Sequence, residues 1–164
     1  IPTSEAYGVD GDVTWRATSN LTVIAAGTAL HTEIKGYTGI NAAGLAASYD
    51  GKPFLYSPKF QGSLTALYKR DLTENLGLQA ALNLRHQSKS HADLEGDPRF
   101  AIPSYSLLNG SIGIHSLDDK WELSLWGRNL ADKYYYPAIS NNSNLIVRFP
   151  GQTRTFGASF TVKY

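Results

Sequence analysis

The chain has 164 residues, a net charge of +1, 18% charged residues, 12% aromatic residues and ten tyrosines. A nearly neutral chain without a recurring basic cluster offers no basis for a nucleic-acid partner. Because cysteine is absent, a disulfide framework, a cysteine nucleophile and a Cys-based metal site are excluded. No window holds the roughly 18 consecutive apolar residues that a membrane-spanning helix needs, but a spanning strand remains possible. The start at Ile1-Pro2 and the absence of methionine predict a processed chain or a fragment.

Seven segments alternate apolar and polar residues, which is the period of a β-strand. In chain order they lie near residues 9–17, 21–34, 63–69, 76–85, 108–114, 121–128 and 155–164. The last is the clearest, because Phe156, Ala158, Phe160, Val162 and Tyr164 share one face. In the second segment apolar residues occupy both faces, so its register cannot be assigned. No segment has the period of a helix.

The links between these segments alternate in length. Short, turn-forming links lie at residues 19–20, 71–75 and 117–120, and long links rich in Gly, Pro, Asn and Ser lie at 35–58, 88–104 and 133–153. If every strand crosses the same slab, one rim carries the turns and the other the loops, which is typical of an antiparallel transmembrane β-barrel. A soluble β-sandwich is the alternative. About seven strands leave unpaired edges, so a barrel needs further strands from elsewhere.

Four stretches carry a resemblance to a known family. The segments "WELSLWGRNLADKYYYPA" and "RFPGQTRTFGASFTVKY" are similar to the closing strands of a TonB-dependent outer-membrane receptor. Upstream, "FLYSPKFQGSLTALY" resembles the family's Pro-Lys-led strand, and "IPSYSLLNGSIGI" resembles its Y-x-x-L-N strand. The last of these ends in Ile114, where an aromatic residue is common in the family. Together the four stretches cover essentially the whole chain.

The resemblance implies a 22-stranded barrel in the bacterial outer membrane, closed by an N-terminal plug. Residues 1–164 would be the C-terminal part of that barrel, with the plug and the remaining strands absent from this chain. The long links would then face outward. The implied function is energised uptake of a scarce ligand, with a ferric siderophore or a similar metal chelate as the default in this family. A passive porin-like or structural barrel subunit completed by other chains is the alternative.

The implied partners are outer-membrane lipid, the missing strands and plug, the TonB complex reached through the plug, the barrel-assembly machinery and a small-molecule ligand. Phe156, Phe160, Val162 and Tyr164 resemble the signal that the assembly machinery reads. A simple lipid-facing strand explains the same four residues. No cofactor is implied.

Candidate ligand-binding residues in the lumen or the outer loops are Arg85, Arg128, Tyr134 and Tyr136. Alternation places Arg128 on the polar face with Glu122, Ser124 and Trp126, and Asn129 and Asp132 in a hydrogen-bonded network beyond the strand end. A structural motif that closes the barrel near its outer rim is the favoured explanation for Arg128. For the lumenal residues Arg16, Arg85 and Arg128 together, ordinary strand pairing with Asp or Glu is favoured over binding of an anionic chelate. Membrane-interface packing is the alternative for the tyrosines, of which Tyr135 points opposite to its neighbours.

Neither metal binding nor catalysis is predicted. His31, His86, His91 and His115 lack metal-ligand spacing. The acidic residues Asp93, Glu95 and Asp97 alternate as in a calcium loop, but Pro98 stands where that loop needs Gly, which favours a solvated loop. No Ser-His-Asp arrangement or phosphate-binding loop is present, so we expect no enzyme.

Overall fold

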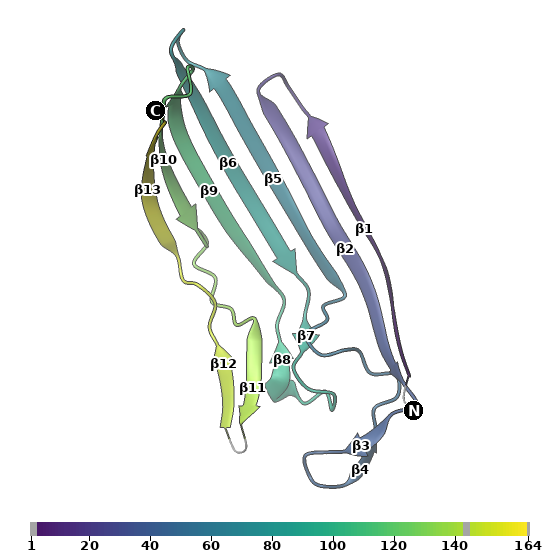
Figure 1. Cartoon of the computed structure of the whole chain (residues 1–164). Helices are drawn as coiled ribbons and strands as arrows, with labels where there is room; N and C mark the ends of the chain where they lie inside the picture. The colour runs from purple at the N-terminus through teal and green to yellow at the C-terminus, as the bar shows by residue number, and fades with distance from the viewer. Residues whose placement is uncertain (1–2, 143–144, 164) are drawn as a thin grey trace.

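A computed structural model describes residues 3–142 and 145–163. Its main feature is a seven-stranded antiparallel sheet in which each strand pairs with its neighbours along the chain. The strands, in sheet order, are β1 (Thr3–Arg16), β2 (Leu21–Lys35), β5 (Phe60–Asp71), β6 (Leu76–Gln87), β9 (Tyr105–Ser116), β10 (Trp121–Arg128) and β13 (Thr155–Val162). The seven predicted strands are confirmed, and the sheet is an open, unclosed part of a barrel (Figure 1).

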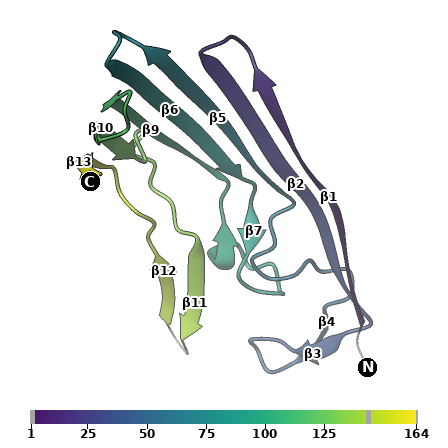
Figure 2. The same ribbon diagram turned by 45° about the horizontal axis from the view of Figure 1, so that its top comes forward.

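The three long links lie together at one end of the sheet, and the short turns lie at the other (Figures 1 and 2). We refer to residues 36–59, 88–104 and 129–154 as the first, second and third long loops. Each contains a small two-stranded sheet. These are β3 (Thr38–Ile40) with β4 (Ala46–Ser48), β7 (Ser90–His91) with β8 (Ala101–Ile102), and β11 (Ala138–Asn142) with β12 (Leu145–Phe149). A single 3-10 turn, Pro98–Phe100, lies within the second long loop.

Among the residues described, no helix is long and apolar enough to cross a membrane.

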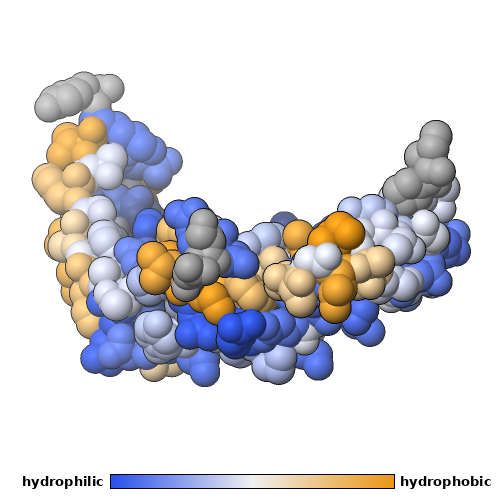
Figure 3. Space-filling model, turned by 90° about the horizontal axis from the view of Figure 1, so that it is seen from below, coloured by the Kyte–Doolittle hydropathy of each residue, from blue (hydrophilic) through white to orange (hydrophobic). Residues whose placement is uncertain are grey.

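The pairing register gives the sheet one apolar and one polar face. Leu84 lies opposite Leu64 and Leu108, and Ile112 lies opposite Ala80 and Leu125, so apolar side chains continue from strand to strand. Thr65, Asn83 and Asn109 form a matching polar row on the other side. Seen from the long-loop end, the molecule is an open trough with hydrophobic side chains along one flank (Figure 3).

The pairing of strand β2 with β5 shows why the register of β2 could not be assigned from the sequence. Val23 and Ala25 pair with Ala66 and Leu64 on the apolar face. Ile24 pairs with Thr65 and therefore lies on the polar face. The strand is hydrophobic on both sides at this point, so alternation alone does not distinguish them.

The apolar face has the height of a membrane core. From Leu76 to His86 strand β6 advances ten residues, which is about 34 Å along the strand. Tilted by about 40°, as strands in membrane barrels are, it rises about 26 Å, and the apolar band of such barrels is about 25 Å tall. Trp15, Tyr68 and Trp121 lie near the short-turn end of this face, where an aromatic belt is expected.

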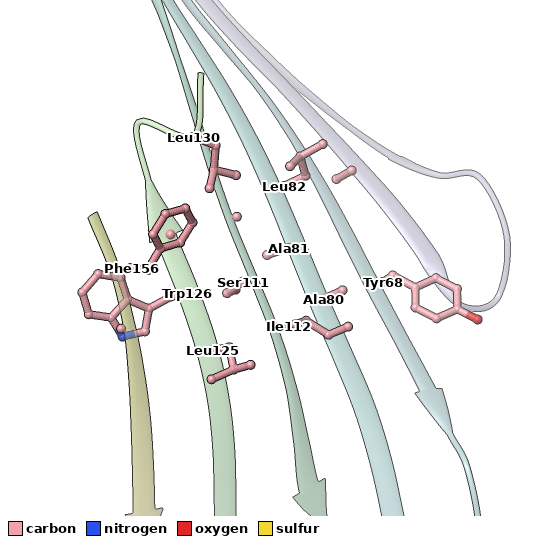
Figure 4. A pocket seen from close by; sticks show the side chains of 14 residues that line it. Tyr68, Ala80, Ala81, Leu82, Ser111, Ile112, Leu125, Trp126, Leu130 and Phe156 are labelled. Atoms are coloured by element: carbon pink, nitrogen blue, oxygen red, sulfur yellow. The ribbon is translucent and has the colours of Figure 1, made fainter. Parts of the chain in front are cut away.

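A shallow apolar groove of about 750 Å³ runs across this face. Figure 4 shows Leu82, Leu125 and Phe156 among the side chains around it. Small residues form its floor, and Leu130 folds back over Gly127, where an added methyl group would lie 2.5 Å from the leucine. The apolar surface is therefore exposed and uneven, as suits contact with fluid hydrocarbon chains.

An ion pair between two residues of the short turn at 117–120 stabilises that turn. The Nζ of Lys120 lies 2.8 Å from Oδ2 of Asp118. The hydrogen bond from Lys120, with a second from Ser116, lowers the pKa of Asp118 from 3.8 to about 2.

A carboxyl titration checks this arrangement. We expect the carboxyl carbon resonance of Asp118 to titrate with a midpoint near pH 2. Because the folded pKa lies below 3.8, the stabilising contribution is present above about pH 4 and is lost as the pH falls toward 2. Lys120→Gln should move the midpoint back toward the ordinary aspartate value. A midpoint near 4 in the parent protein would contradict the contact.

Candidate ligand-binding site

Arg128 lies on the polar face near the long-loop end of the sheet. The register sets it opposite Thr155, and its guanidinium carbon lies 5.4 Å from the centre of the Trp126 ring. This is within the range of a cation–π contact, which holds the guanidinium against an aromatic surface. The predicted placement of Arg128 beside Trp126 on the polar face is confirmed.

A hollow of about 280 Å³, lined by polar side chains and by small residues, lies beside this pair. Its lining includes Asn83, Asn109, Ser111, Trp126 and Arg128. The amide Nδ2 of Asn83 donates to Oγ1 of Thr65 at 2.8 Å, and Oδ1 of Asn109 accepts from the backbone N–H of Asn129 at 3.0 Å. These bonds fix the two amides, so the hollow presents a preorganised set of polar groups around one cation.

The polar face carries arginines that form no ion pair with any of the described residues. Arg85 lies opposite Ser63 and Leu107 in the ladders. The ion pairs found between described residues involve neither Arg85 nor Arg128, nor Arg16. The expectation that Asp or Glu pairs with these arginines is therefore wrong within the described part of the chain. Two cations, Arg85 and Arg128, remain available on the long-loop half of this face.

Two tyrosines whose rings contact each other at a tilt, Tyr105 and Tyr135, lie near Arg85, and the sequence alone did not indicate them as a pair. The hydroxyl of Tyr105 donates to Oε1 of Gln87 at 3.2 Å, which places its ring on the polar face. The ring of Tyr135, from the third long loop, lies 4.7 Å from the ring of Tyr105. Alternation indicated that Tyr135 points away from its neighbours, but only the fold brings Tyr105 to it.

Gly151 makes the Tyr135 position possible. A methyl group on Gly151 would overlap the Tyr135 ring, and the backbone N–H of Gly151 donates to the Tyr135 carbonyl at 2.8 Å. Only glycine leaves room for the ring at this approach. The Pro-Gly step in the third long loop therefore positions an aromatic side chain over the polar face.

Asn129 ties the third long loop to the sheet. Its side chain is 3% exposed, and its φ of +48° lies in the left-handed region that Asn tolerates better than most residues. Nδ2 donates to the carbonyls of Lys133 and Gln152 at 2.9 and 3.0 Å, and Oδ1 accepts from the N–H of Lys133 at 2.9 Å. One side chain thus binds both ends of the loop.

Asp132 joins this network, as predicted. Its N–H donates to the Asn129 carbonyl at 2.8 Å, and its Oδ1 accepts from the N–H of Arg154 at 3.3 Å. The guanidinium of Arg154 lies 3.6 Å from the same carboxylate. The partner of Asp132 is therefore Arg154 rather than Arg128.

Tyr134 and Tyr136 contact each other and line a small hollow together with Tyr105 and Tyr135. Their ring centres are 6.2 Å apart in an edge-on arrangement, and Tyr134 is 70% exposed. The guanidinium carbon of Arg148 lies 5.4 Å from the Tyr136 ring centre. Ligand binding by Tyr134 and Tyr136, like that by Arg85 and Arg128, stays a prediction.

The acidic stretch of the second long loop is internally bonded. Oδ1 of Asp97 accepts from the N–H of Arg99 at 2.8 Å, and Oδ2 of Asp93 accepts from the N–H of Asp97 at 3.0 Å. Oε1 of Glu95 accepts from the N–H of Ala42 at 2.7 Å. Hydrogen bonds from Arg99 lower the pKa of Asp97. No group of three or more metal-binding side chains occurs in residues 3–142 and 145–163.

The residues proposed as an insertion signal lie on the last strand. Phe156 and Phe160 are 69% and 66% exposed on the apolar face of β13, and Val162 lies on the same face. Tyr164 lies outside the described residues. Recognition of these side chains by the assembly machinery stays a prediction.

The sheet has an apolar face as tall as a membrane core and a polar inner face. One of its ends carries long loops and the other carries short turns. These features define a segment of an outer-membrane-type β-barrel. Residues 1–130 match the family model for the TonB dependent receptor-like β-barrel. The chain belongs to the TonB-dependent receptor β-barrel family. That family consists of transporters and receptors rather than enzymes, and its barrels are bacterial outer-membrane proteins.

Solved structures share the fold. The ferric yersiniabactin uptake receptor FyuA from Yersinia pestis matches with a TM-score of 0.82 and 18% identity, over 98% of this chain and 24% of that one. The siderophore receptor PiuA from Acinetobacter baumannii matches with 0.71 and 18%, over 98% and 21%. The ferric-catecholate import receptor Fiu from Escherichia coli K12 matches with 0.67 and 21%, over 96% and 20%. No curated protein sequence matches.

Proposed function

We propose that this chain is the C-terminal part of a TonB-dependent transporter that takes up an anionic metal chelate, such as a ferric siderophore, across the outer membrane. Remaining strands and a plug would complete the barrel. The choice of ligand rests on Arg85 and Arg128, which lie on the polar face and make no ion pair with any residue that the structure describes.

The need for further strands is supported by the edges of the sheet. Strands β1 and β13 each pair on one side only, and unpaired backbone groups facing lipid cost several kcal/mol each. The chain spans about a quarter of the FyuA chain and a fifth of the Fiu chain. Both facts agree with a piece of a larger barrel.

The choice of an anionic chelate is supported by the chemistry near the long-loop rim. Two guanidinium groups attract negative charge, and the adjacent, tilted rings of Tyr105 and Tyr135 offer aromatic surface to a planar group. FyuA, PiuA and Fiu are named for siderophores or their ferric complexes, which agrees with this class.

Uptake measurements with the complete receptor that contains this chain test the proposal. Cells lacking their own iron receptors would be supplied with ferric citrate or a ferric tris-catecholate, both anionic, and with uncharged cyanocobalamin. We expect uptake of an anionic complex that stops when TonB is deleted. Because each charge-assisted hydrogen bond contributes about 1.5 to 3 kcal/mol and two guanidinium groups are removed, Arg85→Gln with Arg128→Gln should weaken binding about 100-fold or more.

Lys69→Gln is the matched control, since Lys69 lies on the same face beside Gln79 but near the short-turn rim. It should leave affinity for the ferric complex unchanged. Equal losses in all variants would remove the argument for the arginine pair. Diffusion of small solutes that is independent of TonB would instead favour a passive porin-like or structural subunit.

A further inference from the structure

We propose that Tyr56 is a positioning residue that joins the first long loop to the third and thereby sets the place of the tyrosines in the third. Its hydroxyl donates to the carbonyl of Ile139, in β11. Its backbone N–H donates to the carbonyl of His91, in the second long loop, at 2.8 Å. One residue of the first long loop therefore contacts both others.

The backbone around Tyr56 is held in an uncommon conformation. Its φ is +54°, in the left-handed region that side chains other than Gly, Asn and Asp rarely adopt. Thr32 of strand β2, which is 9% exposed, anchors both flanks: its Oγ1 accepts from the N–H of Phe54 at 3.1 Å and donates to Oγ of Ser57 at 3.3 Å. The sheet thus fixes the segment that points the Tyr56 ring toward the third loop.

The contact of Tyr56 leads into a hydrophobic cluster formed by the second and third long loops. Phe100, Ile102 and Ile139 are buried there, with Ile102 fully inaccessible and Ile139 2% exposed. Tyr136 packs against this cluster. The carbonyl that accepts from Tyr56 therefore belongs to a residue of the same cluster that supports Tyr136.

Further bonds join the loops in pairs. The N–H of Ala42 in the first loop donates to Glu95 in the second at 2.7 Å, and Arg148 in the third donates to the carbonyl of Arg99 at 3.2 Å. Among the described residues, the hydrogen bond from Tyr56 to Ile139 is the one that directly joins the first loop to the third. Removing its hydroxyl should loosen the third loop without removing the other pairwise bonds.

Tyr56→Phe tests the inference, because it keeps the ring and the backbone and removes the hydroxyl alone. Hydrogen exchange would be measured by mass spectrometry on the complete receptor in detergent. We expect amides of β11 and β12 to exchange at least tenfold faster, while those of β6 and β9 stay unchanged. Affinity for a bound ferric tris-catecholate should fall several-fold with unchanged uptake rate at saturation.

Tyr49→Phe is the matched control. The Tyr49 hydroxyl donates to the carbonyl of Ile40 at 3.3 Å, so its loss removes a bond inside the first loop only. It should leave exchange in β11 and β12 as in the parent. Unchanged exchange in Tyr56→Phe, or equal acceleration in both variants, would overturn the positioning role. The affinity result rests on the proposed function, whereas the exchange result does not, so a receptor that binds no ferric complex would still decide the role of Tyr56.

Discussion

Replacing Asn129 by alanine is expected to release the third long loop and to lower the free energy of unfolding by about 3 kcal/mol. The buried side chain makes three hydrogen bonds, to both backbone groups of Lys133 and to the carbonyl of Gln152. Each is worth about 1 kcal/mol, and groups left unpaired while buried add to the loss. Urea unfolding of the complete receptor in lipid vesicles measures the change.

Asn129→Asp distinguishes the hydrogen bonds that the side chain donates from the one that it accepts. Aspartate tolerates the left-handed backbone and can still accept from the N–H of Lys133, but it cannot donate to the carbonyls of Lys133 and Gln152. We expect faster hydrogen exchange at Gly151 in both variants, since its N–H bonds to Tyr135 in the segment that Asn129 holds. An alanine variant as stable as the parent would show that Asn129 does not tie the loop ends.

Leu125→Arg is expected to destabilise the barrel by about 3 kcal/mol, because arginine near the middle of the lipid-facing band of a membrane barrel costs about 2 to 4 kcal/mol. Leu125 pairs with Ile112 and Ala158 on the apolar face and is 59% exposed. The same vesicle-based unfolding measurement gives the change.

Ser124→Arg, one residue earlier, is the control, because Ser124 pairs with Gly113 and Ser159 on the polar face. We expect a loss of less than about 1 kcal/mol there, since a lumenal arginine keeps contact with water. If the two variants lost the same stability, the assignment of the lipid-facing side would be reversed or the sheet would not face lipid at all.

The seven strands and their faces could be predicted from the sequence because apolar and polar residues alternate along each strand with a period of two. Phe156, Phe160 and Val162 illustrate this, since alternation alone placed them on the apolar side where the pairing puts them. Arg128 was placed beside Trp126 in the same way. Strand β2 was ambiguous because Ile24 breaks the alternation and lies on the polar face.

The contacts of the long loops could not be predicted, since they depend on three-dimensional approach rather than on period. The hairpin strands there have two to five residues, too few to show an alternation. The ring contact of Tyr105 with Tyr135 and the hydrogen bond of Tyr56 to Ile139 join residues 30 and 83 positions apart. That Arg85 and Arg128 make no ion pair with any described residue likewise emerges only from the three-dimensional arrangement.

The placement of the buried cluster in the loops has a consequence for the order of folding. Every ladder in the main sheet joins two strands that are successive members of that sheet along the chain, so the sheet can extend one strand at a time. The cluster of Phe100, Ile102 and Ile139 needs loops that become neighbours only after strands β6, β9 and β10 have paired. We therefore expect the long-loop rim to be the last part of this segment to acquire its native contacts. A chain arrested during assembly would have a paired main sheet but would lack the contacts among the long loops.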